Sequence, residues 1–199
     1  LSGNTVSFTE GGTAVVLENQ IAVSDVDDAN LTKAIIRISE GYGAQDKLAA
    51  SATAGFTINF TAATGTLEIT GDKTKAEWQT LLRTVSFINE DGNNPEGGNR
   101  KVSWKLYDGA NWSQVQQTTV SVTPANDKPT LTIPAGQVAF TEQTPVVIAN
   151  NLTLGDVDSG IKGATVKIKS ALAGDTLLFT NTDKITGTLS QTGAAAADT

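Results

Sequence analysis

The sequence contains no cysteine, no histidine and no methionine, and only 6% of its 199 residues are aromatic. Without histidine or cysteine there is no Ser-His-Asp triad, no thiol nucleophile and no ordinary zinc site. A phosphate-binding loop is also absent, because no Gly-rich stretch leads into Lys and Ser or Thr. We therefore expect no enzymatic activity, although a glycosidase-like pair of carboxylates stays formally open.

Basic residues are few: 14 Lys and Arg stand against 21 Asp and Glu, which leaves a net charge of −7. This balance argues against nucleic acid and anionic membranes as partners and favours hard cations. No stretch approaches the roughly 18 consecutive apolar residues of a membrane span, so no membrane insertion is expected. The chain starts with neither a signal sequence nor an initiator Met, which suggests a piece of a longer polypeptide.

Short apolar stretches between turn residues dominate the chain and predict an all-β protein. "FTINF" and "GTLEI" flank the turn at 63–65 and predict a hairpin. "VSWKLYDG" alternates Val102, Trp104 and Leu106 on one face, and "TTVSVT" does the same with Val120 and Val122. The number and spacing of these strands favour an immunoglobulin-like β-sandwich.

One segment breaks the strand pattern. Thr74 and Glu77 have capping-box spacing. Trp78, Leu81 and Leu82 then follow with helical periodicity, and Val85 continues it. We predict one short helix that packs over an end of the sandwich.

A tandem repeat organises the chain. "VSFTEGGTAVVLENQIAVSDVDDANLTKAIIRI" (6–38) recurs as "VAFTEQTPVVIANNLTLGDVDSGIKGATVKI" (138–168). We place a first β-sandwich repeat at 1–124, a short Pro-containing linker at 125–129, and a second, partial or truncated repeat of the same kind at 130–199. The sequence leaves open whether the second repeat is incomplete or differently built.

Each repeat carries two aspartates one residue apart, Asp25 and Asp27 in the first and Asp156 and Asp158 in the second. Ca²⁺ takes six to eight oxygen ligands, and alternating Asp residues supply carboxylates with carbonyls between them. Crowded carboxylates without a cation repel one another. The alternative is an ordinary turn, in which Asp bonds only to its own backbone.

The combination "FTEGG … SDVDDANLTKAIIRI … YDG … VTPANDKP" resembles the cadherin-like repeats of large bacterial surface proteins, including repeats-in-toxin (RTX) adhesins. The resemblance implies β-sandwich units with Ca²⁺ at the junctions between them. It implies two sets of metal ligands. The set that faces a preceding unit is Asp25, Asp27 and Asp108. The set at the junction between the two repeats is Glu10, Asn126, Asp127, Asp156 and Asp158. The acidic L-D-R-E stretch of vertebrate cadherins is missing, and Glu90-Asp91 is an alternative source. We interpret the other turn aspartates as solvated: Asp28, Asp46, Asp72 and Asp91.

Together these features predict a secreted or cell-surface calcium-binding repeat that rigidifies and extends a bacterial surface protein for cell adhesion. Its expected partners are neighbouring repeats and surface glycans or proteins. The alternative is a carbohydrate- or peptide-binding β-sandwich, with Tyr42 and Trp112 as exposed stacking residues. Finding both aromatic rings on one surface would favour that alternative.

Overall fold

The computed structural model describes residues 3–188, and the chain divides into two compact units, Leu1–Asp127 and Lys128–Thr199. The boundary falls within the segment 125–129 that we interpret as a linker. Residues 189–199 belong to the predicted second repeat and lie outside the described part. Within residues 3–188, no helix is long and apolar enough to cross a membrane.

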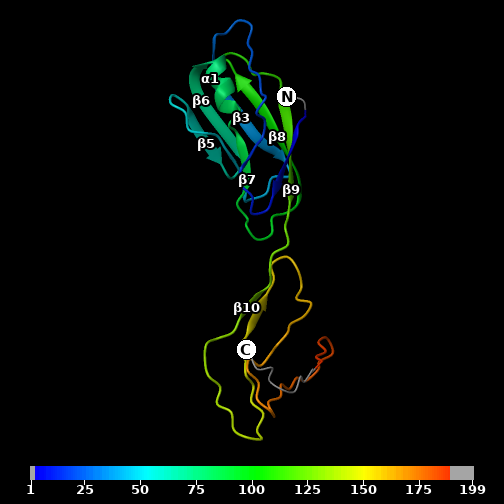
Figure 1. Ribbon diagram of the computed structural model, residues 1–199. Helices are drawn as coiled ribbons and strands as arrows, with labels where there is room; N and C mark the ends of the chain where they lie inside the picture. The colour runs from blue at the N-terminus through cyan, green and yellow to red at the C-terminus, as the bar shows by residue number, and fades with distance from the viewer. Residues whose placement is uncertain (1–2, 189–199) are drawn as a thin grey trace, which may run out of the picture. The chain divides into compact units, whose positions relative to one another are not determined.

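The first unit is a β-sandwich with one short helix, which confirms the predicted fold class (Figure 1). One sheet has six strands in the order β1-β9-β8-β3-β6-β5, and the other has three in the order β2-β7-β4. The bounds of these elements are β1 Thr5–Thr9, β2 Val15–Val16, β3 Asn30–Glu40, β4 Asp46–Ala49, β5 Thr57–Thr61, β6 Thr66–Thr74, α1 Lys75–Leu82, β7 Ser86–Asn89, β8 Gly98–Tyr107 and β9 Gln116–Thr123.

Strands β3 and β8 form the antiparallel centre of the larger sheet. Their register sets Ala34 opposite Leu106, Ile36 opposite Trp104 and Ile38 opposite Val102. These side chains point into the sandwich, where all but the half-buried Leu106 are buried. Val120 and Val122 of β9 are buried beside them, so the predicted alternation of both strands is confirmed.

The hairpin of β5 and β6 forms where the sequence predicts it, with Thr61 opposite Thr66. Its turn needs glycine, because Gly65 has a φ of +62°. A Cβ at this position would also lie 2.8 Å from the ring of Tyr42. The turn thus packs against the ring of Tyr42, which comes from another loop.

Helix α1 begins at the predicted capping box. Thr74 N–H donates to Glu77 Oε2 at 3.0 Å, and Glu77 N–H donates to Thr74 Oγ1 at 3.3 Å. Trp78 is buried and donates its indole N–H to the Leu31 carbonyl at 2.8 Å. The ring of Phe56 meets Trp78 edge-on, with centroids 4.9 Å apart. The helix is therefore anchored to the start of β3 by a hydrogen bond as well as by packing.

Asp46 is buried, and its interpretation as a solvated turn residue is wrong. Its carboxylate accepts hydrogen bonds from Arg100 Nε at 3.0 Å, Asn89 Nδ2 at 2.7 Å and Gly43 N–H at 2.7 Å. Arg100 is itself buried, and its Nη2 donates to the Glu96 carbonyl at 2.6 Å. The ion pair therefore connects β4 of the smaller sheet to β8 of the larger one. Sequence reasoning missed it because the two partners are far apart along the chain.

The second unit is far less regular in its described residues. β10 (Thr130–Thr132) pairs antiparallel with β11 (Thr153–Gly155). Residues 164–168 match part of β3 in sequence, yet they form no strand. In the first unit β3 is held on both sides by β6 and β8, and the described part of the second unit has no counterpart of either strand. Its large apolar side chains, such as Phe140 and Val147, are exposed.

Replacing Asp46 by Asn should leave the Arg100 guanidinium buried without a charge partner. We expect the free energy of unfolding of the first unit to fall by about 3–5 kcal/mol. Urea denaturation followed by tryptophan fluorescence measures this unit selectively, because the three tryptophans are Trp78, Trp104 and Trp112. Asp72→Asn, at an exposed position, is the matched control and should stay within about 0.5 kcal/mol of the wild type. Equal stability of both variants would contradict a stabilising role for the ion pair.

Candidate metal centre

The loop that leads into β3 is closed by Asp25. Its Oδ1 accepts the backbone N–H groups of Asp27 at 3.2 Å and Asp28 at 2.8 Å, which is an Asx turn. Lys75 of α1 donates its Nζ to the carbonyls of Asp25 and Asp28, at 2.9 and 2.7 Å. The loop is therefore held both internally and against the first turn of the helix.

Asp108 approaches the same place from another element, directly after β8. Its Oδ1 accepts the N–H groups of Ala110 at 2.6 Å and Asn111 at 2.7 Å, which forms a second Asx turn. Tyr107, the last residue of β8, lies opposite Lys33 of β3. The antiparallel pairing thus brings the end of β8 beside the loop that enters β3.

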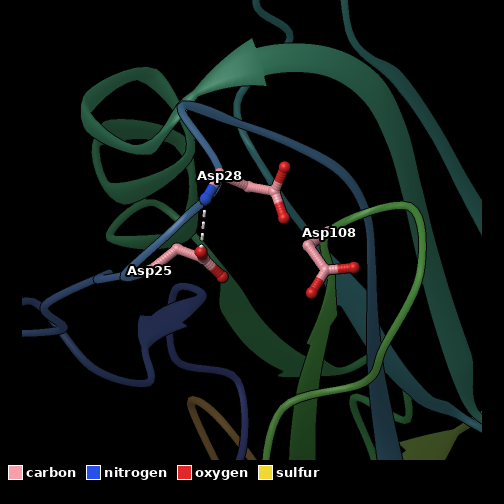
Figure 2. A group of neighbouring side chains, drawn as sticks. All are labelled: Asp25, Asp28 and Asp108. Carbon is pink, nitrogen blue, oxygen red and sulfur yellow. Dashed lines mark hydrogen bonds between the residues drawn. The ribbon is translucent and has the colours of Figure 1, made fainter.

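Asp25, Asp28 and Asp108 form what we call the acidic group (Figure 2). One carboxylate oxygen from each lies within 4.8 Å of the others. Ca²⁺ binds oxygen at about 2.3–2.6 Å, so two ligands of one ion lie at most about 5 Å apart. Three hard oxygen donors at this spacing match the chemistry of a calcium site.

The crowding of charge has opposite effects on two members of the acidic group. Partial desolvation raises the pKa of Asp28, and the negative charges of Asp27, Asp108 and Asp25 raise it further. The pKa of Asp25 is lowered, chiefly by the hydrogen bond from the Asp28 N–H. Asp25 is thus stabilised as a carboxylate, while the Asp28 carboxylate is the one that a cation would relieve.

The structure places Asp28 in the acidic group, whereas Asp27 lies outside it. The D-x-D spacing directs residues 25 and 27 to one side only if the chain is extended. The Asx turn reverses the chain instead, so residue 28 is the one that meets Asp108. The tendency of Asp25 to form a turn is the sequence feature that could have indicated this arrangement. The sequence alone does not show which following side chain the turn places beside Asp108. Asp28 is exposed, as expected for a turn residue.

Glu10, Asn126 and Asp127 lie toward the opposite end of the first unit. Glu10 follows β1, its N–H donates to the Thr123 carbonyl at 3.0 Å, and its Oε2 accepts the Ala125 N–H at 2.7 Å. Within the described residues, Glu10 Oε1 is shielded from solvent and has no hydrogen-bond partner. Asn126 Nδ2 donates to the Asp127 carbonyl at 2.6 Å. The ligand role of Glu10 stays a prediction.

Asp156 repeats the Asx turn of Asp25 within the second unit. Its Oδ1 accepts the N–H groups of Asp158 at 3.3 Å and Ser159 at 2.7 Å. Hydrogen bonding to the Asp158 side chain, followed by the Ser159 N–H, lowers the pKa of Asp156. A site shared by Asp156 and Asp158 with Glu10, Asn126 and Asp127 stays a prediction.

Three other acidic residues, Glu90, Asp91 and Asp72, have partners outside the acidic group. Glu90 forms an ion pair with Lys47 at 2.9 Å, and Asp91 accepts the Asn93 N–H at 3.2 Å in a turn. Asp72 is exposed and accepts a hydrogen bond from the Asn30 side chain at 2.8 Å. None of the three belongs to the acidic group.

Tyr42 and Trp112 do not form one aromatic platform. Tyr42 follows the end of β3, is half-buried against the core, and donates its hydroxyl to the Ala62 carbonyl. Trp112 pairs with Tyr107, which lies opposite Lys33 near the start of β3. The two rings are thus near opposite ends of an 11-residue strand, a separation on the order of 25 Å. The alternative based on this pair is not supported.

Fold and site together define a β-sandwich repeat whose loops place aspartates in repeated Asx turns. No protein-family model matches the chain. Among curated proteins, halomucin from Haloquadratum walsbyi (strain DSM 16790 / HBSQ001) is 28% identical over 116 residues, which cover 55% of this chain and 1% of halomucin. The chain thus corresponds to a very small part of the relative it matches.

The raised pKa of Asp28 predicts a specific pH dependence of stability. Its carboxyl holds a proton more tightly in the folded chain than in the unfolded one, so this contribution is fully present below the unfolded pKa and is lost as pH rises through the folded pKa, above 3.8. Asp28→Asn cannot ionise. In EDTA at neutral pH this variant should melt at a higher temperature than the wild type, and the difference should vanish near pH 3.

Circular dichroism melting curves between pH 3 and pH 7 measure this difference. The opposite contribution of Asp25, whose pKa is lowered, is present in both proteins and largely cancels. Asp72→Asn is the control for removing an exposed carboxylate and should show a smaller change at neutral pH. A wild type that is as stable as Asp28→Asn at every pH would show that the acidic group carries no repulsion.

Proposed function

We propose that this chain is a calcium-binding structural repeat of a large extracellular surface protein. The observation that carries the proposal is the convergence of three carboxylate oxygens, from two separate loops, within 4.8 Å of one another. Lys75 offsets this charge only in part, because its Nζ donates to backbone carbonyls rather than to the carboxylates. A bound Ca²⁺ would neutralise the group and cross-link the two loops.

The proposed extracellular location of this repeat rests on the affinity of such sites for calcium. Sites in extracellular modules typically have dissociation constants of about 10⁻⁴–10⁻³ M, which millimolar external calcium fills and cytosolic calcium does not. The carboxylates of the acidic group repel one another without a cation. Bound calcium would therefore stiffen the repeat only outside the cell.

The tandem organisation supports a spacer role within a longer chain. The two units share the same Asx turn, at Asp25 and Asp156, at equivalent positions of the repeat. The similarity to a small part of halomucin fits a repeat within a much larger protein. Repeats joined by short linkers make extended, quasi-linear assemblies. On this proposal the chain has no catalytic role, neighbouring repeats are its first partners, and it extends a surface protein that serves cell adhesion.

Calcium should raise the melting temperature of the first unit. With a dissociation constant of about 10⁻⁴–10⁻³ M, about 10 mM CaCl₂ adds roughly 1.4–2.7 kcal/mol to the free energy of unfolding. For a domain of this size that corresponds to a rise of several degrees, which EDTA should reverse. Thermal unfolding followed by tryptophan fluorescence measures the effect.

Two variants make the test specific. Asp28→Asn should be more stable than the wild type in EDTA and should lose most of the calcium response, because it removes both the repulsion and a ligand. Asp72→Asn should keep the full response. The proposal is wrong if calcium and magnesium at equal concentration give the same small shift, or if Asp28→Asn responds as the wild type does.

A further inference from the structure

The outer face of strands β3 and β8 is not a uniform solvated surface. Because Ile36 and Trp104 point inward, their neighbours along each strand point outward. These outward side chains border a hollow of about 400 Å³, which we call the outer-face hollow. Its lining is formed by Ile35, Arg37, Thr66, Ser103, Trp104, Lys105 and Val115.

Two cations, Arg37 and Lys105, line the outer-face hollow. Arg37 lies opposite Ser103, and Lys105 lies opposite Ile35, so the two cations are diagonal neighbours with Cα atoms roughly 7–8 Å apart. Within residues 3–188, neither forms an ion pair with a carboxylate. The other lysines of these strands do: Lys33 with Glu68 at 3.3 Å and Lys101 with Glu40 at 2.7 Å.

The position of these cations argues against a role in protecting the sheet. Lysines that prevent aggregation belong on edge strands, whereas β3 and β8 are the two central strands of six. In a chain of net charge −7, two unpaired cations side by side over an apolar floor create a local attraction for an anion. Arg37 also offers the planar donor pair that binds a carboxylate in two places.

Trp112 lies beside the outer-face hollow and is held in place. Its ring contacts Tyr107 with centroids 4.9 Å apart and an interplanar angle of 34°. Its loop is closed by the Asx turn of Asp108. Trp112 nevertheless stays 41% exposed, and Val115 stays 57% exposed. A rigid, exposed indole reduces the entropy that a ligand loses on stacking.

Lys105 links the aromatic ring to the cationic pair. Its Nζ lies 4.2 Å from the centroid of the Trp112 ring. A cation–π contact at an exposed site is weak, whereas a hydrogen bond between an ammonium group and a carboxylate is charge-assisted. A carboxylate in the hollow would draw Lys105 off the ring and uncover more of the indole face.

We propose that the outer-face hollow binds an acidic oligosaccharide. Arg37 and Lys105 bind the carboxylate of a uronic acid, the hydroxyls of Ser103 and Thr66 bond to sugar hydroxyls, and the C–H face of a sugar ring stacks on Trp112. The C–H groups carry slight positive charge and are attracted to the negative face of the indole.

The full chain should be titrated with tetragalacturonate in EDTA, so that the outcome does not depend on calcium. Nuclear magnetic resonance of the indole N–H groups reports on the three tryptophans separately. Trp78 donates its indole N–H to the Leu31 carbonyl inside the core, away from the hollow, and should not shift. The Trp112 signal should move, and the neutral tetrasaccharide maltotetraose should leave it unchanged.

Variants then test the contacts. Isothermal titration calorimetry, which needs no tryptophan signal, measures the affinities; Arg37→Gln and Trp112→Ala should each weaken tetragalacturonate binding about tenfold, as expected for the loss of a charge-assisted or stacking contact. Lys162→Gln, which makes the same change of charge at an exposed position of the second unit, should leave the affinity unchanged. Unchanged melting temperatures confirm that the variants are folded.

Several outcomes would overturn the proposal. One is the absence of any shift of the Trp112 signal at tetragalacturonate concentrations up to about 10 mM. A site with a dissociation constant above that concentration would bind too weakly to be specific. Another is equal binding of maltotetraose. A third is equal weakening by Lys162→Gln, which would reduce the effect to net charge. Binding of penta-glutamate as tightly as tetragalacturonate would assign the hollow to acidic peptides instead.

Discussion

The antiparallel pairing of β3 with β8 is the constraint on which the rest of the first unit depends. Its register sends Ile36 and Trp104 into the core and leaves Ile35 and Lys105 on the outer face. It also carries Asp108 to the loop that enters β3. A slip of one residue would exchange the two faces. The core, the acidic group and the outer-face hollow therefore all depend on this one register.

The Asx turns show how one residue type can serve both structure and binding. Asp25, Asp108 and Asp156 each use one carboxylate oxygen to close a turn of their own backbone. The turn interpretation and the ligand interpretation are therefore compatible, since the turn is what fixes the carboxylate in place. Within the described part of the chain, Asp28 accepts no such turn hydrogen bonds, and partial desolvation together with neighbouring negative charges raises its pKa. The chain accepts local electrostatic repulsion that a cation would turn into a cross-link.

The two units show how far strand formation depends on distant partners. Ala34–Ile38 and Ala164–Ile168 match in sequence, but only the former lies in a sheet. Strands β6 and β8 supply its hydrogen-bond partners, and its inward side chains are buried in the core of the sandwich. The local turn at Asp156 forms without such help, because its hydrogen bonds span only two or three residues.

Short-range patterns determined the features that close within one element: the capping box at Thr74 and Glu77, the hairpin turn at Gly65, and the alternation along β8. Each of these depends on neighbours within about four residues, which the sequence displays directly. The tertiary structure decided the rest. It buried Asp46 against Arg100, put Asp28 rather than Asp27 beside Asp108, and separated Tyr42 from Trp112. Those outcomes depend on which strands pair and in what register, and that is settled by burial of the whole core rather than by any local segment.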